Sequence, residues 1–205
     1  MKIVKISAQR PDPKAIQEAA RVIARGGLVV FPTETVYGLG ANAFDARAVR
    51  KIFKVKGRPE KKPLIVHVSK KSTLDVLAQD IPAVTRKLVA KFWPGPLTLV
   101  LKARSSVPKE VTGGGDTVAI RMPAHRVALA LIRAAGPIAA PSANFSGHPP
   151  PREVREISRM LRMKVDMVLD GGRCTVGVPS TVVDCTVNPP KILRKGVFSK
   201  YQLGI

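Results

Sequence analysis

The sequence predicts an α/β fold in which helices pack against an open, twisted, mixed sheet. Strand-like and helix-like segments alternate along all 205 residues, and no low-complexity linker or internal repeat divides them. A hydrophobic content of 45% with 24% charged residues is typical of a globular protein with a sizeable core. We therefore expect one domain over residues 1–205.

Boundary residues set the elements of the first third of the chain. A short strand at 3–6 precedes a helix that Asp12 caps, Pro13 opens and Gly26 ends. The apolar run 28–31 predicts a buried strand, and the stretch "PTETVYGLG" after it is expected to be a loop. Two further elements follow, a helix at 45–55 and a strand at 64–68.

The rest of the chain continues the same alternation. Helices are expected at 72–78, 82–92, 125–135 and 151–163. Strands are expected at 97–102, 117–121, 137–140, 166–170, 175–178, 180–185 and 191–195, with a glycine-rich turn, "TGGGD", before the second of them. The mixed connections and several edge strands argue against a purely parallel, Rossmann-type sheet.

The charge balance is unusual and bears on partners. Lys and Arg number 35 and Asp and Glu 14, so the net charge is +21, which attracts polyanions such as RNA, DNA and nucleotides. No run approaches the roughly 20 apolar residues of a membrane span, and the first residues lack a secretory leader. Two cysteines do not make a disulfide framework. We expect a cytoplasmic location.

The stretch "KGRPEKKPLIVHV" joins a cationic loop to an apolar strand. Strand alternation places His67 on the face opposite Val66, so one face is apolar and the other polar. A partly buried histidine with no function is the simplest interpretation of His67 alone. Lys56 and Arg58 lie where a helix ends, in a loop that two prolines stiffen, and such a loop is suited to holding phosphates.

Three further stretches place hydroxyl-bearing residues directly after short strands. They are "PTETVYGLG", "PSANFSG" and "VPSTVVD". Each is explained by turn chemistry alone, because Ser, Asn, Pro and Gly dominate turns for local reasons. Together with the cationic loop, they point to a ligand crevice at the strand ends.

Several common sites are absent from the sequence. It has no P-loop, no G-x-G-x-x-G opening a helix and no G-x-S-x-G elbow, and its His and Cys residues lack zinc spacing. An enzyme with this sequence is expected to work by positioning its substrates and neutralising charge, without a covalent nucleophile or a protein-bound metal.

Four arginines are expected along one face of the 151–163 helix, because they are spaced 3, 4 and 3 residues apart. They are Arg152, Arg155, Arg159 and Arg162. A solvated face and a contact with an RNA phosphate backbone both fit this pattern. The 4% aromatic content argues against base-stacking platforms for single strands.

Taken together, the motifs resemble the YrdC-like threonylcarbamoyl-adenylate synthases. The matching stretches, in family order, are "FPTETVYGLG", "KGRPEKKPL", "WPGPLTLVL", "VAIRMPAH", "PSANFSG", "DGG" with "STVVD", and "LRKG". The resemblance implies a twisted α/β sheet around a large basic concave surface. Because the chain ends at Ile205, it resembles the short, single-domain form; Lys195 stands where the family often has proline.

The resemblance also implies an activity and its partners. It is the condensation of L-threonine, bicarbonate and ATP to threonylcarbamoyl-AMP and pyrophosphate, with a magnesium ion brought by ATP. A separate threonylcarbamoyl transferase complex would use the product to modify an adenosine of tRNA. The alternative, from composition and the arginine spacing, is a module that binds double-stranded RNA or tRNA.

Site residues are likewise implied by the matching motifs. Lys56 and Arg58 are expected to be catalytic. The residues expected to bind ATP are Lys56, Arg58, Lys62, Thr117, Ser142, Asn144 and Arg194. Those expected to bind threonine are Thr33, Thr35, His67, Arg121, Ser180 and Thr181. Arg121 is suited to the threonine carboxylate, and His67 could be a base or only a ligand contact.

Overall fold

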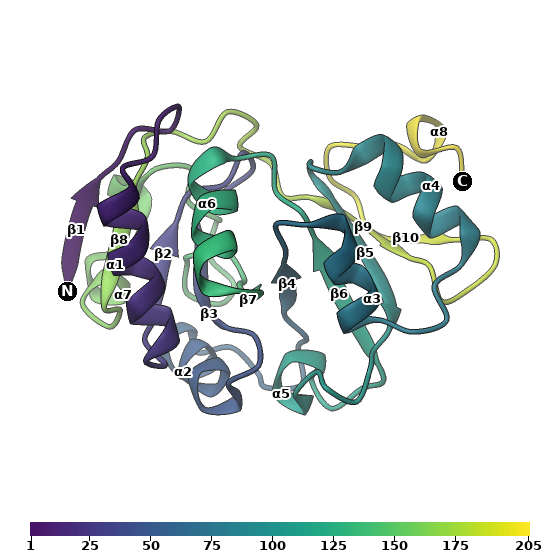
Figure 1. Cartoon of the computed structure of the whole chain (residues 1–205), viewed down its shortest axis with the longest axis horizontal. Helices are drawn as coiled ribbons and strands as arrows, with labels where there is room; N and C mark the ends of the chain where they lie inside the picture. Colours follow the sequence, from purple (N-terminus) through teal and green to yellow (C-terminus); the bar gives the residue numbers. More distant parts are fainter.

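The computed structural model describes residues 1–205 and has a ten-stranded mixed sheet at its centre (Figure 1). Its strands are β1 (Lys2–Lys5), β2 (Val29–Phe31), β3 (Gly38–Asn42), β4 (Ile65–His67), β5 (Leu97–Lys102), β6 (Thr117–Arg121), β7 (Ile138–Ala139), β8 (Met167–Asp170), β9 (Thr181–Asp184) and β10 (Lys191–Arg194). The strand order is β1-β8-β2-β3-β7-β4-β6-β5-β9-β10. Parallel and antiparallel pairs are interspersed, which confirms the mixed sheet.

The helices lie beside this sheet and mostly fall where the sequence predicts them. They are α1 (Pro13–Ala24), α2 (Ala46–Lys56), α3 (Leu74–Leu77), α4 (Ala83–Phe92), α5 (Lys109–Thr112), α6 (Arg126–Ala135), α7 (Arg159–Arg162) and α8 (Lys200–Leu203). Two short 3-10 turns are η1 (Lys71–Thr73) and η2 (Val154–Glu156). None of the helices combines the length and the apolar character that spanning a membrane requires.

Helix α1 begins as its sequence dictates and packs beside α6 on one face of the sheet (Figure 1). The Asp12 carboxylate accepts a hydrogen bond from the Lys14 amide, and Pro13 occupies the first turn, where no amide donor is needed. Ile16 and Ile23 of α1 and Leu131 of α6 then bury against Phe31 of β2. This layer fixes one half of the sheet.

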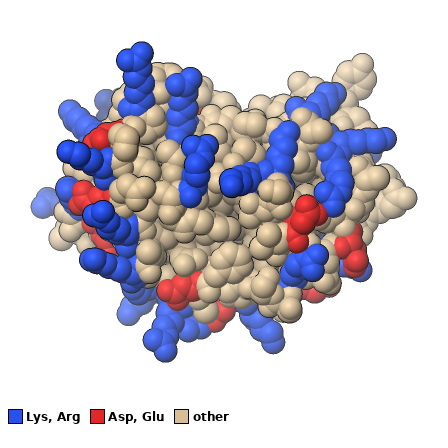
Figure 2. Space-filling model, in the orientation of Figure 1, with Lys and Arg blue, Asp and Glu red and all other residues tan.

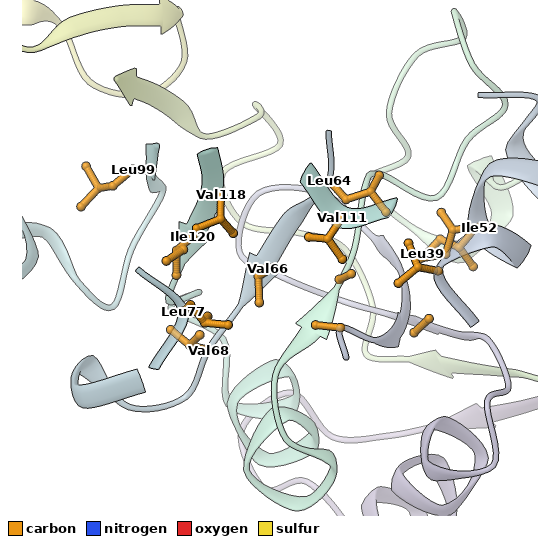
Figure 3. Packing of buried hydrophobic residues seen from close by; sticks show 14 of the residues in the cluster. Leu39, Ile52, Leu64, Val66, Val68, Leu77, Leu99, Val111, Val118 and Ile120 are labelled. Carbon is orange, nitrogen blue, oxygen red and sulfur yellow. The ribbon is translucent and has the colours of Figure 1, made fainter. Parts of the chain in front are cut away.

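A larger apolar cluster runs across the opposite face of the sheet (Figure 3). It extends from Leu39 and Ile52, past Val66 of β4, to Ile120 and Leu99 of the neighbouring strands. Val66 is fully buried there, so alternation turns Ile65 and His67 to the other face of β4. The predicted polar face of this strand is therefore confirmed.

The stretch "PTETVYGLG" contains a strand that the sequence does not predict. Residues 38–42 form β3, which pairs antiparallel with β2 and β7. Gly40 is required because a Cβ there would lie 2.7 Å from both Phe31 and Ile138. Two glycines and an alanine give no strand signal, since their small size serves close packing and not β-propensity.

The predicted helix at 151–163 is wrong. The chain forms η2 and the four-residue α7 instead, separated by Ile157 and Ser158 in extended conformations. Glu156 folds back to accept a hydrogen bond from the Arg152 amide. This path buries Val154, Ile157 and Leu161, which a single helix was expected to bury from one face. The four arginines do not share a helical face.

Smaller differences concern the ends of the sheet. The predicted strand at 175–178 is a loop, whereas α5 and α8 are short helices that the sequence does not predict. Cys174 and Cys185 are buried, free thiols. Figure 2 shows Lys and Arg side chains mostly around the margins of one face of the molecule, with fewer acidic side chains among them.

Candidate functional site

A cleft of about 470 Å³ lies over the half of the sheet that contains β4, β5, β6 and β9. Its floor is formed by residues that alternation places on one face of these strands. They are Ile65, His67, Val100, Ala119, Arg121 and Val182. The loops after β2, α2, β7 and before β9 form its walls, as expected for hydroxyl-rich loops at strand ends. A cleft of this size fits a ligand as large as a nucleotide.

Three arginines line the cleft, and no carboxylate does. Arg58 donates to the carbonyl oxygens of Lys62 and Pro63 at 3.3 and 3.0 Å. Arg194 donates to the carbonyl oxygen of Ser180 at 2.9 and 3.1 Å. Burial and the nearby charges of Arg121 and Arg58 lower the pKa of Arg194, so these guanidinium groups repel one another. An anion between them would relieve that repulsion.

Arg121 is held on the cleft floor by a different kind of partner. Its Nη2 lies 2.7 Å from Oε1 of Glu34, and both side chains are buried. Its Nε donates to the Gly95 carbonyl at 3.2 Å, and its Nη1 donates to Oγ1 of Thr35 at 2.9 Å. Two nitrogens of the guanidinium group therefore donate hydrogen bonds to the protein, while Nη2 lies within ion-pair distance of Glu34 without a hydrogen bond of its own.

A chain of hydroxyl groups continues from Arg121. Thr33 Oγ1 donates to the Val36 carbonyl at 2.7 Å, and it lies 2.9 Å from Thr35 Oγ1. Since the proton of Thr33 is used on Val36, Thr35 must donate to Thr33 and accept from Arg121. Thr33, Thr35 and Arg121 thus form one ordered network at the cleft surface.

His67 lies beside Arg121, its register partner on β6. Burial and then the positive charge of Arg121 lower the pKa of His67 to about 3. The imidazole is therefore neutral near pH 7. Its Nδ1 is buried without a hydrogen-bond partner in the protein.

Lys56 does not line the cleft but lies behind the loop that follows β7. Its Nζ donates to the carbonyl oxygens of Ser142, at 2.5 Å, and Asn144. Burial and then the charge of Arg58 lower the pKa of Lys56 to about 8. Ser142 lines the cleft from this loop, so Lys56 holds a wall of the cleft in place.

The remaining expected residues are not all brought to the cleft. The Asn144 amide nitrogen donates to the carbonyls of Phe145 and His148, within its own loop. Lys62 is exposed beyond Arg58, and Thr117 lies at the far end of β6. None of these three lines the cleft.

Ser180 and Thr181 are buried where the chain crosses itself. Ser180 lies 2.8 Å from Thr98 Oγ1 and accepts a hydrogen bond from Arg194. Thr181 Oγ1 accepts from the Phe198 amide at 2.8 Å. A Cβ on Gly196 would lie 2.4 Å from the Thr181 amide nitrogen, so only glycine permits this crossing. Ser180 lines the cleft, whereas Thr181 does not line it and instead holds the crossing chain in place through its bond to Phe198.

The four arginines predicted to contact RNA lie outside this cleft. Arg152, Arg155 and Arg159 are exposed, and Arg162 is half-buried. Arg155 and Arg173 both pair with Glu153, at 2.9 and 3.2 Å. The carboxylate of Glu153 thus compensates part of the positive charge of this segment.

The site residues expected from the sequence do not include two residues that the cleft depends on. In the sequence, Glu34 has the position of an ordinary loop residue. Its ion pair with Arg121 is evident only from the structure, where both side chains are buried. Thr98 is hidden in an apolar strand, where β-propensity explains a threonine without function. No group of three or more His, Cys, Asp or Glu side chains in the 205 residues is arranged to hold a metal ion.

The fold and the cleft define a class: an α/β protein whose arginine-lined hollow suits small anionic ligands. A profile of the Sua5_yciO_yrdC family, described as telomere recombination, matches residues 21–196. A threonylcarbamoyl-AMP synthase of Pyrococcus abyssi is 51% identical over 92% of this chain and 56% of its own length. One from Bacillus subtilis is 47% identical over 94% of this chain and 56% of its own. The chain belongs to the Sua5/YciO/YrdC family.

The fold agrees with this assignment. The crystal structure of Pyrococcus abyssi Sua5 complexed with L-threonine matches with a TM-score of 0.93 at 50% identity. The match covers 96% of this chain and 58% of that one. The chain thus spans little more than half the length of these relatives.

Proposed function

We propose that this protein is a threonylcarbamoyl-AMP synthase, which condenses L-threonine, bicarbonate and ATP and releases pyrophosphate. The observation that carries the proposal is a carboxylate-free cleft with three arginines, two of them bonded only to neutral oxygens. The curated relatives have the same activity in their names, and one related protein was crystallised with L-threonine. Cytoplasmic tRNA modification by a separate transferase complex is part of the proposal.

In this proposal the two ends of the cleft have different tasks. Arg58 and Arg194 hold the phosphates of ATP and neutralise the charge that accumulates on the leaving pyrophosphate. Arg121 receives the carboxylate of threonine, with the Thr35 hydroxyl beside it. Neutral His67 offers a hydrogen bond to the threonine or its carbamate, and burial keeps it from acting as a proton carrier near pH 7.

Lys56 acts in this scheme as a positioning residue. Its ammonium group is bound to the backbone of the Ser142–Asn144 loop, so it shapes the nucleotide end of the cleft without lining it. Lys62, Thr117, Asn144 and Thr181 also act through the walls. Since the cleft has no carboxylate, magnesium would be held by the triphosphate, where it supplies further charge neutralisation.

The direct test is pyrophosphate release by the purified protein with ATP and magnesium. Release is expected only when both L-threonine and bicarbonate are present. Arg58→Gln should lower kcat/KM for ATP by about a hundredfold, because a charge-assisted contact made in the transition state is lost. Arg86→Gln is the matched control, since Arg86 is exposed and paired with Asp75 away from the cleft. Release without threonine would refute the proposal.

A second candidate function is binding of tRNA or double-stranded RNA. It is favoured by a hollow of about 470 Å³ on α2, which adjoins the cleft through Arg58. The other cations around it are Arg47, Arg50, Lys51 and Lys54. A phosphate backbone is a natural ligand of such a row of cations. The four arginines at 152–162 remain predicted contacts of the same kind.

A further inference from the structure

Glu34 is a buried carboxylate that the proposed reaction does not use. Its side chain is 7% exposed, and that of its partner Arg121 is 5% exposed. It does not line the cleft, so it touches Arg121 from behind. Its backbone is fixed as well, because its carbonyl accepts a hydrogen bond from the Val176 amide at 2.8 Å. A buried ion pair is costly to form and is a weak explanation of stability alone.

The three arginines of the cleft differ in the charge of their partners. Arg58 and Arg194 are bonded to backbone carbonyls and a hydroxyl, which leave their full positive charge in place. Arg121 alone is paired with a carboxylate, which offsets part of its charge. The cleft thus has a strongly cationic end, at Arg58 and Arg194, and a less cationic end at Arg121.

We propose that Glu34 is a specificity-determining and positioning residue: by offsetting part of the charge of Arg121, it makes that end of the cleft accept an amino-acid carboxylate and reject phosphate. The inference rests on the proposed function. A carboxylate is planar and singly charged, and it needs two aligned donors more than it needs net charge. Phosphate carries more charge, so its binding depends more on an uncompensated cation. The phosphates of ATP are thereby kept at the end with Arg58 and Arg194, and the carboxylate of threonine is kept at the end with Arg121.

The test removes the negative charge of Glu34 while keeping the shape of its side chain. Binding of L-threonine to the wild-type protein and to Glu34→Gln is measured by calorimetry, in inorganic phosphate and in chloride of equal ionic strength. Phosphate should change the wild-type affinity less than twofold. It should weaken threonine binding to Glu34→Gln about tenfold, because phosphate then competes for the unpaired Arg121. Glu18→Gln, in an exposed pair with Lys2, is the control.

A second variant covers the case in which Glu34→Gln does not fold. Glu34→Asp keeps the charge but draws it back by one methylene, so an intermediate sensitivity of about threefold is expected. A purely structural role predicts weaker threonine binding in both variants with no new sensitivity to phosphate, and that result would overturn the inference alone. If the wild-type protein does not bind L-threonine, the proposed function fails and the inference fails with it.

Discussion

At His67, two effects act on the imidazole in the same direction. Burial disfavours the charged ring, and Arg121 on the adjacent strand disfavours it further, so the pKa of His67 falls to about 3. In the unfolded chain the ring has its ordinary pKa of about 6.5. Between those values the unfolded state binds more protons, so the free energy of unfolding falls as the pH is lowered from about 6.5 toward 3.

The first prediction follows from this sign. His67→Gln should reduce the pH dependence of the unfolding free energy in that window by about 1 kcal/mol per pH unit. Urea unfolding of both proteins at pH 4, 5, 6 and 7.5 measures the difference. Parallel curves for the two proteins would show that His67 is not the neutral, buried group described above.

Lys56 and Arg58 are two residues apart, yet their substitution is predicted to affect different properties: stability for Lys56 and nucleotide binding for Arg58. Lys56→Met removes the donor from two backbone carbonyls of the Ser142–Asn144 loop and should cost about 2 kcal/mol of stability. Amide exchange of Ser146, whose N–H is bonded to the Lys56 carbonyl, should also become faster. Arg58→Gln should leave stability within about 0.5 kcal/mol of wild type, since it is a change in a wall of the cleft.

Thermal unfolding and nucleotide titration separate these two effects. Lys56→Met is expected to lower stability more than it lowers nucleotide affinity, and Arg58→Gln to do the reverse. The opposite order would place Lys56 on the ligand and not behind the loop.

At the scale of elements, the chain makes a very close approach beside the cleft where it crosses the loop before β9. A methyl group on Gly196 would lie 2.4 Å from the Thr181 nitrogen and 2.5 Å from the Pro179 oxygen, both of which are backbone atoms. Gly196→Ala should therefore cost about 3 kcal/mol or more and shift Arg194 away from Ser180.

The control for this change is another glycine. Gly115 has an ordinary contact of 3.5 Å to its nearest neighbour, so Gly115→Ala should be tolerated. Thermal melts of the two variants, with nucleotide titration of each, make the comparison. Equal stability of the two would mean that the crossing is looser than its distances imply.

The elements also show what sequence patterns can predict. Alternation places Val66 in the core and His67 in the cleft, because a strand has a fixed period of two. The same reasoning fails at 151–163, where apolar spacings of 3 and 4 fit a helix as well as two short turns joined by an extended Ile157–Ser158. Strand β3 is not predicted because its glycines are needed for close packing against the ring of Phe31 on the neighbouring strand. No local sequence pattern shows that contact.

The same limit applies to the site residues. Motif order predicts that Arg58, Arg121, Ser142, Ser180 and Arg194 serve one site, and all five line one cleft. It does not predict that Lys56 faces away, or that Glu34 pairs with Arg121, since both depend on contacts between residues far apart in the sequence. Partners of this kind are fixed by tertiary packing and leave no local signal.

At the scale of the whole molecule, the net charge of +21 raises the affinity for any polyanion, so binding alone does not identify an RNA surface. Salt dependence does, because each phosphate contact contributes about 0.9 to the slope of log K against log salt. Arg47 and Lys54 on α2 are exposed cations beside the cleft, and Arg155 and Arg159 represent the other candidate surface.

The last prediction compares these two pairs. Arg47→Gln with Lys54→Gln should lower the slope for a short RNA duplex by about 1.8, whereas Arg155→Gln with Arg159→Gln should lower it less, because Glu153 already pairs with Arg155. Neither pair lines the cleft, so threonine-dependent pyrophosphate release should stay unchanged in both. Slopes that equal the wild-type value in both double variants would exclude these surfaces as RNA contacts. A larger loss with the second pair would instead place the duplex on the 152–162 segment.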